Sequence, residues 1–147
     1  PSRCSPRRPQ KPRFLIVCEG SETEPNYLNG LRAFKRLSKN IIVIHGSDKA
    51  GCTDPKSLVQ YAKKVRQQAK QDGLPFDEVW CAFDRDEHLS FDEALVLAKD
   101  VSIQIAHSTP AVELWLLLHF QDQTGFIDRK RARSQLKKHM RTTKNQN

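Results

Sequence analysis

The sequence predicts an α/β domain in which a mostly parallel, four-stranded sheet carries helices on both faces. Short apolar runs of strand length alternate with segments of helical periodicity from residue 14 to residue 120. Strands separated by helices of about 10 or more residues pair in parallel, because the crossover returns the chain to the same end of the sheet. The runs are continuously apolar, as expected of strands buried on both faces. In such sheets the active site lies at the carboxyl ends of the strands.

The first half of this pattern contains two strands and two helices. Residues 14–18 and 41–44 are predicted as buried strands, separated by a helix that begins near Pro25, since proline suits a first helical turn. Residues 45–54 form a polar loop with two glycines. Asp54 then precedes a proline, as a helix N-cap would. The apolar stripes are Leu28, Leu31, Phe34 and Leu37 in the first helix and Leu58, Val59, Ala62, Val65 and Ala69 in the second.

The second half is predicted to add two strands and three helices. Gly73 and Pro75 end the preceding helix. Pro110 opens a very apolar helix, which should be buried because it is apolar on every side. In chain order the expected elements are strand 78–83, helix 91–98, strand 102–106, helix 111–120 and a basic helix over 131–140.

The positive charge of the chain gathers at its two ends. Lys and Arg number 25 against 17 Asp and Glu, a formal net charge of +8 over 147 residues. Residues 1–13 hold four prolines and five Lys or Arg, and residues 129–144 hold eight Lys or Arg. We expect a basic disordered arm over residues 1–12 and one domain over 13–147 that ends in the basic helix. This charge favours nucleic acid as partner; the alternative is that basic ends only keep the protein in solution.

The remaining composition argues against membrane and zinc proteins. The longest apolar run, residues 114–118, is far shorter than the roughly 20 residues that span a bilayer, and no signal-peptide pattern is present. The four cysteines have no Cys-x-x-Cys spacing, and two of them lie in apolar strand-like runs. We expect a cytoplasmic protein with no membrane partner.

Two acidic motifs directly follow the first and third predicted strands. Glu19 precedes Gly20, which would let the backbone turn sharply beside a site. Asp84 and Asp86 are alternate residues, so on an extended segment their side chains project to the same side. If the two strands are near neighbours, the three carboxylates meet. Hard oxygen ligands without His or Cys favour Mg²⁺ or Mn²⁺ over zinc, and such an ion can polarise a phosphoryl oxygen. The alternative is ordinary turn chemistry at strand ends.

Two further acids and one histidine extend this hypothesis. Glu24 could reach a second metal, although a carboxylate is favoured at a helix start in any case. Glu113 lies in the apolar helix, where an ionised carboxylate needs a metal or a basic partner. His119, in the same helix, is expected to be a core histidine with satisfied hydrogen bonds.

Candidate phosphate contacts are cations and one histidine near the acidic motifs or in the basic helix. Positive groups stabilise the charge that builds on phosphate in the transition state, and a histidine can shuttle a proton. For the histidine, an exposed loop position without function is the alternative. The candidates are Lys49, Arg85, His88, Arg129, Lys130 and Arg131.

Three segments together resemble the RloB-like family of bacterial proteins. They are FLIVCEGSETEPNY at residues 14–27, VWCAFDRDEH at 79–88 and AVELWLLLHF at 111–120. The Glu-Gly and Asp-x-Asp motifs also resemble the Toprim domain of topoisomerases, primases and OLD-type nucleases. The resemblance covers about residues 8–141. It implies a Toprim-like fold, Mg²⁺-dependent nuclease activity and a role in anti-phage or abortive-infection defence, often beside restriction-modification genes.

The resemblance also implies roles for individual residues. Glu19, Asp84 and Asp86 match the Toprim metal positions. Glu113 and His119 match a Glu-x-Trp-x-x-x-His segment of the RloB-like family. One departure is the Ala-Val pair before Glu113, where the family pattern leads us to expect a bulkier aromatic residue.

Three functions are compatible with these residues. The favoured one is a metal-dependent nuclease acting on DNA or RNA. The second is a non-catalytic basic nucleic-acid-binding module with a Toprim-like fold, which three mutually repelling carboxylates disfavour. The third is another Mg²⁺-dependent phosphoryl transfer, such as nucleotidyl transfer or topoisomerase-like strand passage, which would need a tyrosine nucleophile or a nucleotide pocket. Tyr27 and Tyr61 lie in predicted helices and neither is an evident nucleophile. A homo-oligomer and a defence-system partner protein both stay open.

Overall fold

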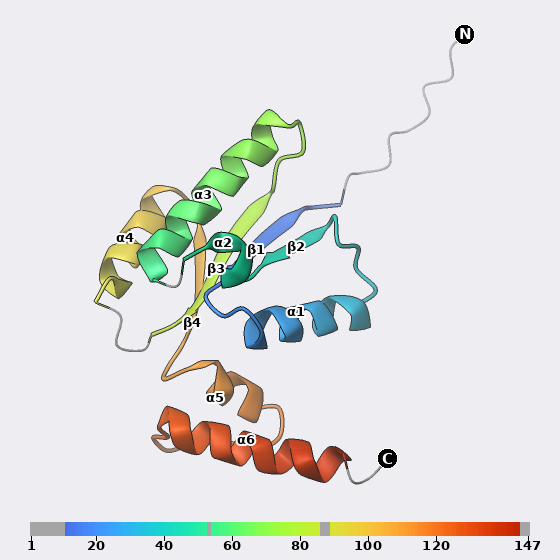
Figure 1. Cartoon of the computed structure of the whole chain (residues 1–147), viewed down its shortest axis with the longest axis vertical. Helices are drawn as coiled ribbons and strands as arrows, with labels where there is room; N and C mark the ends of the chain where they lie inside the picture. Colours follow the sequence, from blue (N-terminus) through green and yellow to red (C-terminus); the bar gives the residue numbers. More distant parts are fainter. Residues whose placement is uncertain (1–10, 53, 86–88, 145–147) are drawn as a thin grey trace.

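A four-stranded, all-parallel sheet forms the centre of the molecule, as predicted (Figure 1). The computed structural model describes residues 11–52, 54–85 and 89–144, without the side chains of 142–144. The strand order is β2-β1-β3-β4. Because β1 and β3 are neighbours, Glu19 and Asp84 lie side by side at the edge of the sheet. The strands are β1 (Phe14–Cys18), β2 (Ile42–His45), β3 (Glu78–Asp84) and β4 (Gln104–Ser108).

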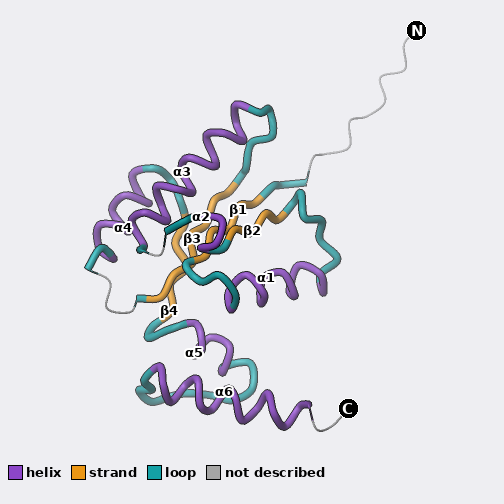
Figure 2. The backbone as a smooth tube through the Cα atoms, viewed as in Figure 1, coloured by secondary structure: helices purple, strands orange, loops and turns teal. Residues whose placement is uncertain are grey.

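Six helices accompany the sheet within the described residues (Figure 2). Asp54 caps the long third helix as expected, since its Oδ1 accepts the Ser57 N–H at 3.0 Å. The last helix begins earlier than predicted, because Asp128 Oδ1 accepts the Arg131 N–H at 2.9 Å and caps it. The helices are α1 (Thr23–Phe34), α2 (Ser47–Ala50), α3 (Pro55–Gln71), α4 (Phe91–Asp100), α5 (Val112–Leu117) and α6 (Arg129–Lys144).

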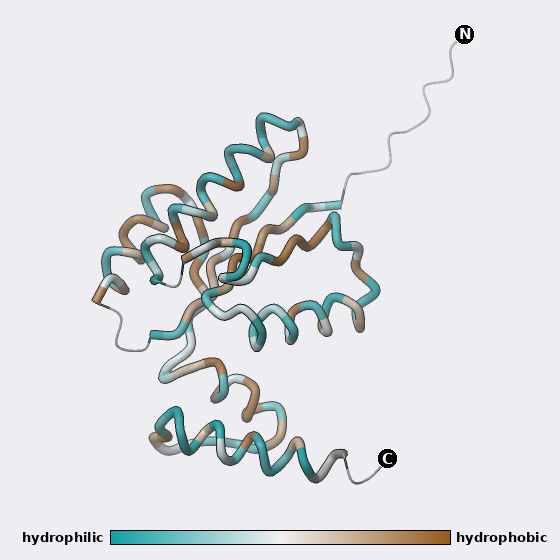
Figure 3. The backbone as a smooth tube through the Cα atoms, viewed as in Figure 1, coloured by the Kyte–Doolittle hydropathy of each residue, from teal (hydrophilic) through white to brown (hydrophobic). Residues whose placement is uncertain are grey.

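The main hydrophobic core lies between one face of the sheet and helices α3 and α4. Leu15 and Val17 of β1 are fully buried there, and so is Leu58 of α3. Figure 3 shows the strands as mostly hydrophobic and α6 as mostly hydrophilic. Each large apolar side chain buried in this way stabilises the fold by about 1.5–3 kcal/mol relative to its exposure. This core holds the strand ends, and hence the acidic motifs, in place.

The opposite face of the sheet is covered only in part. Helix α1 packs on it against β2, and no helix of the described residues lies over the outer surface of β3 and β4. Ala106 of β4 is therefore exposed on this side. The predicted apolar stripe of α1 is also incompletely buried: Leu31 is 42% exposed and Phe34 is 79% exposed. An apolar depression is left between α1 and the far half of the sheet.

Helices α5 and α6 form a hairpin beyond the carboxyl ends of the strands (Figure 1). The hairpin has a small core of its own, made of Leu117, Ile127, Ala132 and Leu136. The expectation that the whole apolar helix would be buried is wrong, since Trp115 is 51% exposed. The reason is that α5 buries one side against α6 and leaves its other side open. No helix of the described residues is both long and apolar enough to cross a membrane.

Candidate active site

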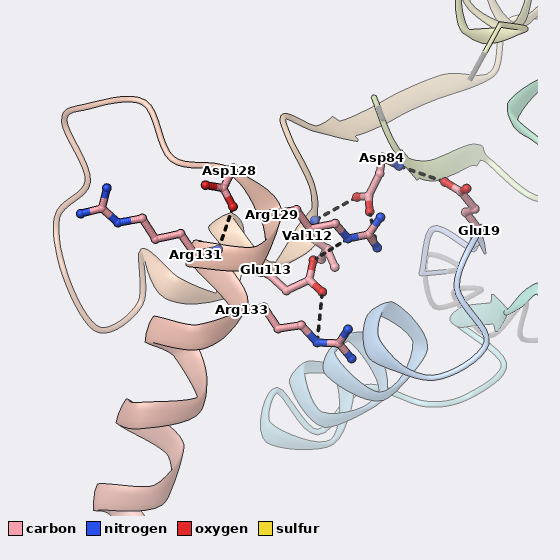
Figure 4. A network of polar contacts seen from close by, with 8 residues as sticks. All are labelled: Glu19, Asp84, Val112, Glu113, Asp128, Arg129, Arg131 and Arg133. Atoms are coloured by element: carbon pink, nitrogen blue, oxygen red, sulfur yellow. Dashed lines mark hydrogen bonds and ion pairs between the residues drawn. The ribbon is translucent and has the colours of Figure 1, made fainter. Parts of the chain in front are cut away.

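The first and third strands bring Glu19 and Asp84 into direct contact (Figure 4). Glu19 follows β1 immediately and Asp84 is the last residue of β3. The Asp84 backbone N–H donates to Glu19 Oε2 at 3.0 Å. The Glu19 N–H donates to the Ala82 carbonyl oxygen at 2.9 Å, which continues the β1–β3 ladder by one residue. Both acids thus occupy the carboxyl edge of the sheet, where parallel α/β proteins place their sites.

Asp84 is an acid that the fold has removed from water. It is only 6% exposed, and its Oδ1 accepts the Val112 N–H at 2.9 Å. The pKa of Asp84 is raised to about 7, chiefly by burial and also by the nearby Glu24 and Glu19 carboxylates, while the hydrogen bond from Val112 and the charge of Arg129 oppose the rise. A buried acid that is poised to change its charge near neutrality is typical of functional sites.

Glu24 approaches the same place from the first turn of α1. Its carboxylate lies against Gly20, where a Cβ would collide with the Glu24 oxygens. Gly20 does not lie in the left-handed region, unlike Gly51 and Gly73. The backbone at residue 20 therefore does not require glycine for a positive φ, and a side chain there would have to displace the flexible Glu24 carboxylate. Burial raises the pKa of Glu24, and the charges of Glu19 and Glu113 add to the rise.

Glu113 enters the cluster from the first turn of α5 and is 9% exposed. Its Oε2 lies 3.7 Å from Arg129 Nε, and its Oε1 lies 4.0 Å from Arg133 Nε. The basic partner expected as one alternative is thus present. Oε2 nevertheless has no hydrogen bond within the described residues. A buried carboxylate oxygen in that condition is costly, and it presents an open position for a cation or a donor.

Arg129, at the start of α6, bridges two of these acids. Its Nη2 lies 3.5 Å from Asp84 Oδ2, while its Nε faces Glu113. The side chain is 48% exposed, so the ion pairs are screened by water and are worth little more than surface pairs. Figure 4 shows Arg131 pointing away from this cluster. Lys130 is exposed.

The acids line a cleft of about 360 Å³, here called the carboxylate cleft. It is bounded by residues 19–24, Asp84, Val112, Glu113 and Arg129. Its donors are carboxylate oxygens, which suit Mg²⁺ or Mn²⁺ in chemistry. Within the described ranges, however, no three His, Cys, Asp or Glu side chains gather closely enough to hold a metal ion. Asp86 lies outside the described residues, and so does His88.

A family comparison covers the whole of this arrangement. A family model described as RloB-like protein matches residues 14–147. The chain belongs to the RloB-like protein family. The match runs from β1 to α6, so every element that contributes to the carboxylate cleft lies within it. Comparison with curated proteins and with solved structures found no match.

Two of the predicted phosphate contacts of this RloB-like protein lie apart from the acids. The Arg85 guanidinium packs over the Phe91 ring, with Cζ 5.6 Å from the ring centroid. Lys49 is exposed on α2, a short helix within the stretch that was predicted to be a polar loop. Lys49 lines a separate polar cleft of about 380 Å³, together with Arg32 and Lys39.

Arg133 was not among the residues predicted for this site. Arg129 and Arg133 are four residues apart on α6, so they share one face of the helix. That spacing was visible in the sequence, but nothing in it indicated which face of α6 meets Glu113. The RloB-like chain places Arg129 and Arg133, rather than Arg131, beside the acids.

An aromatic group beside the cleft was also missed. Tyr27 of α1 and His119 after α5 are joined by a 3.2 Å hydrogen bond between Tyr27 Oη and His119 Nε2. His119 Nδ1 lies 2.9 Å from the Trp115 carbonyl oxygen. His119 thus has satisfied hydrogen bonds, as expected, but it is exposed, and the expectation of a core position is wrong. The signal was the four-residue spacing of Trp115 and His119, which places them on one helix face.

Proposed function

We propose that this RloB-like protein is a divalent-metal-dependent nuclease that hydrolyses phosphodiester bonds in DNA or RNA. Glu19, Asp84 and Asp86 are its catalytic, metal-binding acids in this proposal. The observation that carries it is the contact between Glu19 and Asp84 at the carboxyl edge of the sheet, where Asp84 is almost fully buried. The resemblance of the two acidic motifs to Toprim domains supports the same assignment.

The metal ligands in this proposal are Glu19, Asp84 and Asp86, and Glu24 and Glu113 are additional candidate ligands. Bound Mg²⁺ or Mn²⁺ would polarise the phosphoryl group and lower the pKa of a bound water. The Glu113 oxygen that lacks a hydrogen bond within the described residues supports a role beside the cation. The carboxylates alone would repel a polyanion, so a cation is needed to bring phosphate to this cleft.

The protein's own residues would move the proton and balance the charge. Hydrolysis adds water across one P–O bond: hydroxide joins phosphorus, and the leaving oxygen takes up a proton. Glu19 would accept the proton of the attacking water. Arg129, half exposed and at the rim of the cleft, would turn from the carboxylates to the phosphate oxygens as charge builds there. Lys49, Arg85, His88, Lys130 and Arg131 remain candidates for contacts along the nucleic acid.

On family membership and resemblance, we extend the proposal to anti-phage or abortive-infection defence. A nuclease with such a role would be held inactive or away from host nucleic acid until it is triggered. A defence-system partner protein or self-association would provide that control.

A basic nucleic-acid-binding module is the second candidate, and one observation favours it. Arg129 already lies within 4 Å of both Asp84 and Glu113, at 3.5 Å and 3.7 Å, and so supplies positive charge to these acids without a metal. In this alternative the carboxylates hold α6 against the sheet and the basic surface binds nucleic acid.

Substitution of the acids separates the two candidates. We expect Asp84→Asn and Asp86→Asn each to abolish metal-dependent cleavage while the fold is kept, because Asn preserves the shape but not the charge that holds a hard cation. Glu19→Gln should behave in the same way. The measurement is incubation of each purified protein with plasmid, single-stranded DNA and tRNA in Mg²⁺, Mn²⁺ or EDTA.

Asp100→Asn is the matched control, since Asp100 is an exposed acid at the end of α4. It should cleave like the wild type. Isothermal titration calorimetry provides the binding readout. If Mg²⁺ binds the wild-type protein no better than the Asp84→Asn variant, the nuclease proposal is wrong and the binding module takes its place.

A further inference from the structure

An apolar groove of about 410 Å³ lies beside the carboxylate cleft. We call it the α1–α5 groove, because Tyr27, Leu28 and Leu31 of α1 form one wall and Trp115 of α5 forms part of the other. Ala82 of β3 and Ala106 of β4 also line it, from the uncovered face of the sheet. The small side chains of these two strands leave room above the sheet that no described residue fills.

The groove and the carboxylate cleft adjoin each other. Glu24, Asp84 and Val112 line both of them. One end of the combined depression therefore holds the acids and Arg129, and the other end is apolar and aromatic. A molecule that spans both would carry an anionic group at one end and a flat apolar group at the other.

The aromatic walls are held in fixed positions. The His119 ring meets the Trp115 ring edge to face at 5.4 Å between centroids, and meets the Tyr27 ring in the same way at 5.7 Å. The interplanar angles are 81° and 76°. A ring that is already ordered loses little conformational entropy when a ligand stacks on it.

We infer that the α1–α5 groove binds a nucleobase of the nucleic acid whose phosphate lies in the carboxylate cleft. This inference rests on the proposed function. A nucleotide has the required shape, with a flat ring joined through the sugar to a phosphate, and unpaired bases are commonly held by aromatic side chains. The groove has the volume of a small-ligand pocket, whereas a stable protein interface buries about 800 Å² on each partner.

The hydrogen bonds of His119 indicate one polar contact to the base. Its Nδ1 faces a carbonyl oxygen, so Nδ1–H donates to Trp115 and the neutral ring has Nε2 as an acceptor. Tyr27 therefore donates its hydroxyl proton to Nε2, and its oxygen keeps lone pairs that can accept. An amino or imino group on the base edge suits this position. The groove would then prefer a single-stranded or unpaired nucleotide, whose base edge is free.

The inference is tested by comparing oligonucleotides with and without bases. The probes are a fluorescein-labelled thymidine homopolymer and an abasic oligonucleotide of the same length, both titrated with Ca²⁺ in place of Mg²⁺ and followed by anisotropy. Wild-type protein should bind the thymidine strand about fivefold or more tightly than the abasic strand, which is the effect expected of one stacked base. Equal affinities would overturn the inference.

Trp115→Leu should remove this preference and leave the affinity for the abasic strand unchanged, because the phosphate contacts are kept. Trp115 is half exposed, so the variant should fold, and circular dichroism checks that it does. The matched control is Phe126→Leu, since Phe126 is 91% exposed and does not line the groove. A preference that persists in the Trp115→Leu variant would assign the base contact elsewhere and overturn the inference.

A second readout uses fluorescence. The chain has two tryptophans, so Trp80→Phe leaves Trp115 as the single reporter, and the thymidine strand should quench it while the abasic strand should not. Sedimentation of the protein alone tests whether a second copy of the chain occupies the groove instead. A dimer that Trp115→Leu dissociates would assign the groove to that second copy and overturn the inference. The Glu19→Gln variant should keep the base preference, because Glu19 lines the carboxylate cleft and not the groove, so loss of cleavage and loss of base binding are distinguished.

Discussion

Asp84 carries its carboxyl group into a part of the molecule from which water is largely excluded. Its position at the end of a buried strand could be predicted from the sequence, because an acid after a continuous apolar run must lie at a strand terminus. Its burial could not be predicted. That depends on Val112 and α5 closing over it, which is a contact between segments 28 residues apart.

The raised pKa of Asp84 predicts how stability depends on pH. Without metal, the free energy of unfolding should fall as pH rises from about 4 to about 7, by at most about 1.4 kcal/mol per pH unit. In that range the folded protein keeps a proton on Asp84 that the unfolded chain has released, since burial raises the folded pKa to about 7. This stabilising contribution is complete below about pH 4 and is lost above the folded pKa.

Urea denaturation across this pH range measures the effect, with the Asp84→Asn protein as control. The control lacks the titrating group and should show a smaller slope, with stability near neutral pH that equals or exceeds that of the wild type. Equal slopes for the two proteins would contradict the assignment to Asp84. Because a cation competes with the proton, Mg²⁺ affinity should increase with pH up to about 7 and then level off.

At the scale of single elements, the strands were the most predictable part of the fold. Continuous apolar runs located β1 and β3 to within one residue, although one face of these strands is only partly covered and Ile16, Trp80 and Ala82 are half-buried there. The start of β4 was placed two residues early, since Ser102 adopts a positive φ of 53° and belongs to the turn. Helix α2 was missed because four residues are too few to show a helical period.

In the hairpin of α5 and α6, sequence periodicity could not predict which apolar side chains are buried. The apolar residues after Pro110 predicted a buried helix, yet Trp115 and Phe120 are about half exposed. Composition reports how much apolar surface a helix has, but not whether a neighbouring element of the chain covers it. The exposed side of α5 became a wall of the α1–α5 groove, which the sequence did not indicate.

Helix α6 should be held against the acids by Arg129 rather than by its overall charge. We expect Arg129→Gln to lower the free energy of unfolding by about 1 kcal/mol at pH 8 and low salt, because two buried carboxylates lose a positive neighbour. Arg131→Gln removes the same charge from a side chain that points away (Figure 4), and should change stability by less than about 0.5 kcal/mol.

Urea denaturation at two salt concentrations gives this comparison. The difference between the two variants should shrink at high salt, since the Arg129 ion pairs are half exposed and screened. Equal losses of stability would mean that the cluster does not anchor α6.

At the scale of the whole molecule, the order of the strands in the sheet brings Glu19 and Asp84 together. The alternation of strands and helices predicted a parallel sheet, but not which strands would be neighbours. The order β2-β1-β3-β4 places the two strands that end in acids at the centre. Had β2 lain between them, Glu19 and Asp84 would have been about 10 Å apart, given the strand spacing of about 4.8 Å.

The charge at the amino-terminal end predicts a salt dependence of nucleic-acid binding. Deleting residues 1–12 removes four Lys or Arg, and the slope of log affinity against log salt concentration should flatten by up to about 3.6 on duplex DNA. Phosphate contacts by these residues release counterions without reading sequence. Fluorescence anisotropy at several salt concentrations measures the slope, and an unchanged slope would exclude the arm from the contact.

Substitution of Arg13, the residue that follows this arm, is the matched control for the deletion of residues 1–12. Its guanidinium donates to the carbonyl oxygens of Leu74 and Pro75 and packs over the Phe76 ring at 4.6 Å. Because these contacts occupy it, Arg13→Gln should affect stability more than the salt slope.

The two separate hydrophobic cores have a consequence for how the molecule opens. One core joins the sheet to α3 and α4, and the other lies inside the α5–α6 hairpin. Units with their own cores can open independently, each with its own free energy. The carboxylate cleft lies where these two units meet. Asp84 belongs to the first unit, and Glu113 and Arg129 belong to the second. A partial opening that leaves the sheet intact would therefore disassemble the carboxylate cleft, so the cleft can be no more stable than the weaker of the two units.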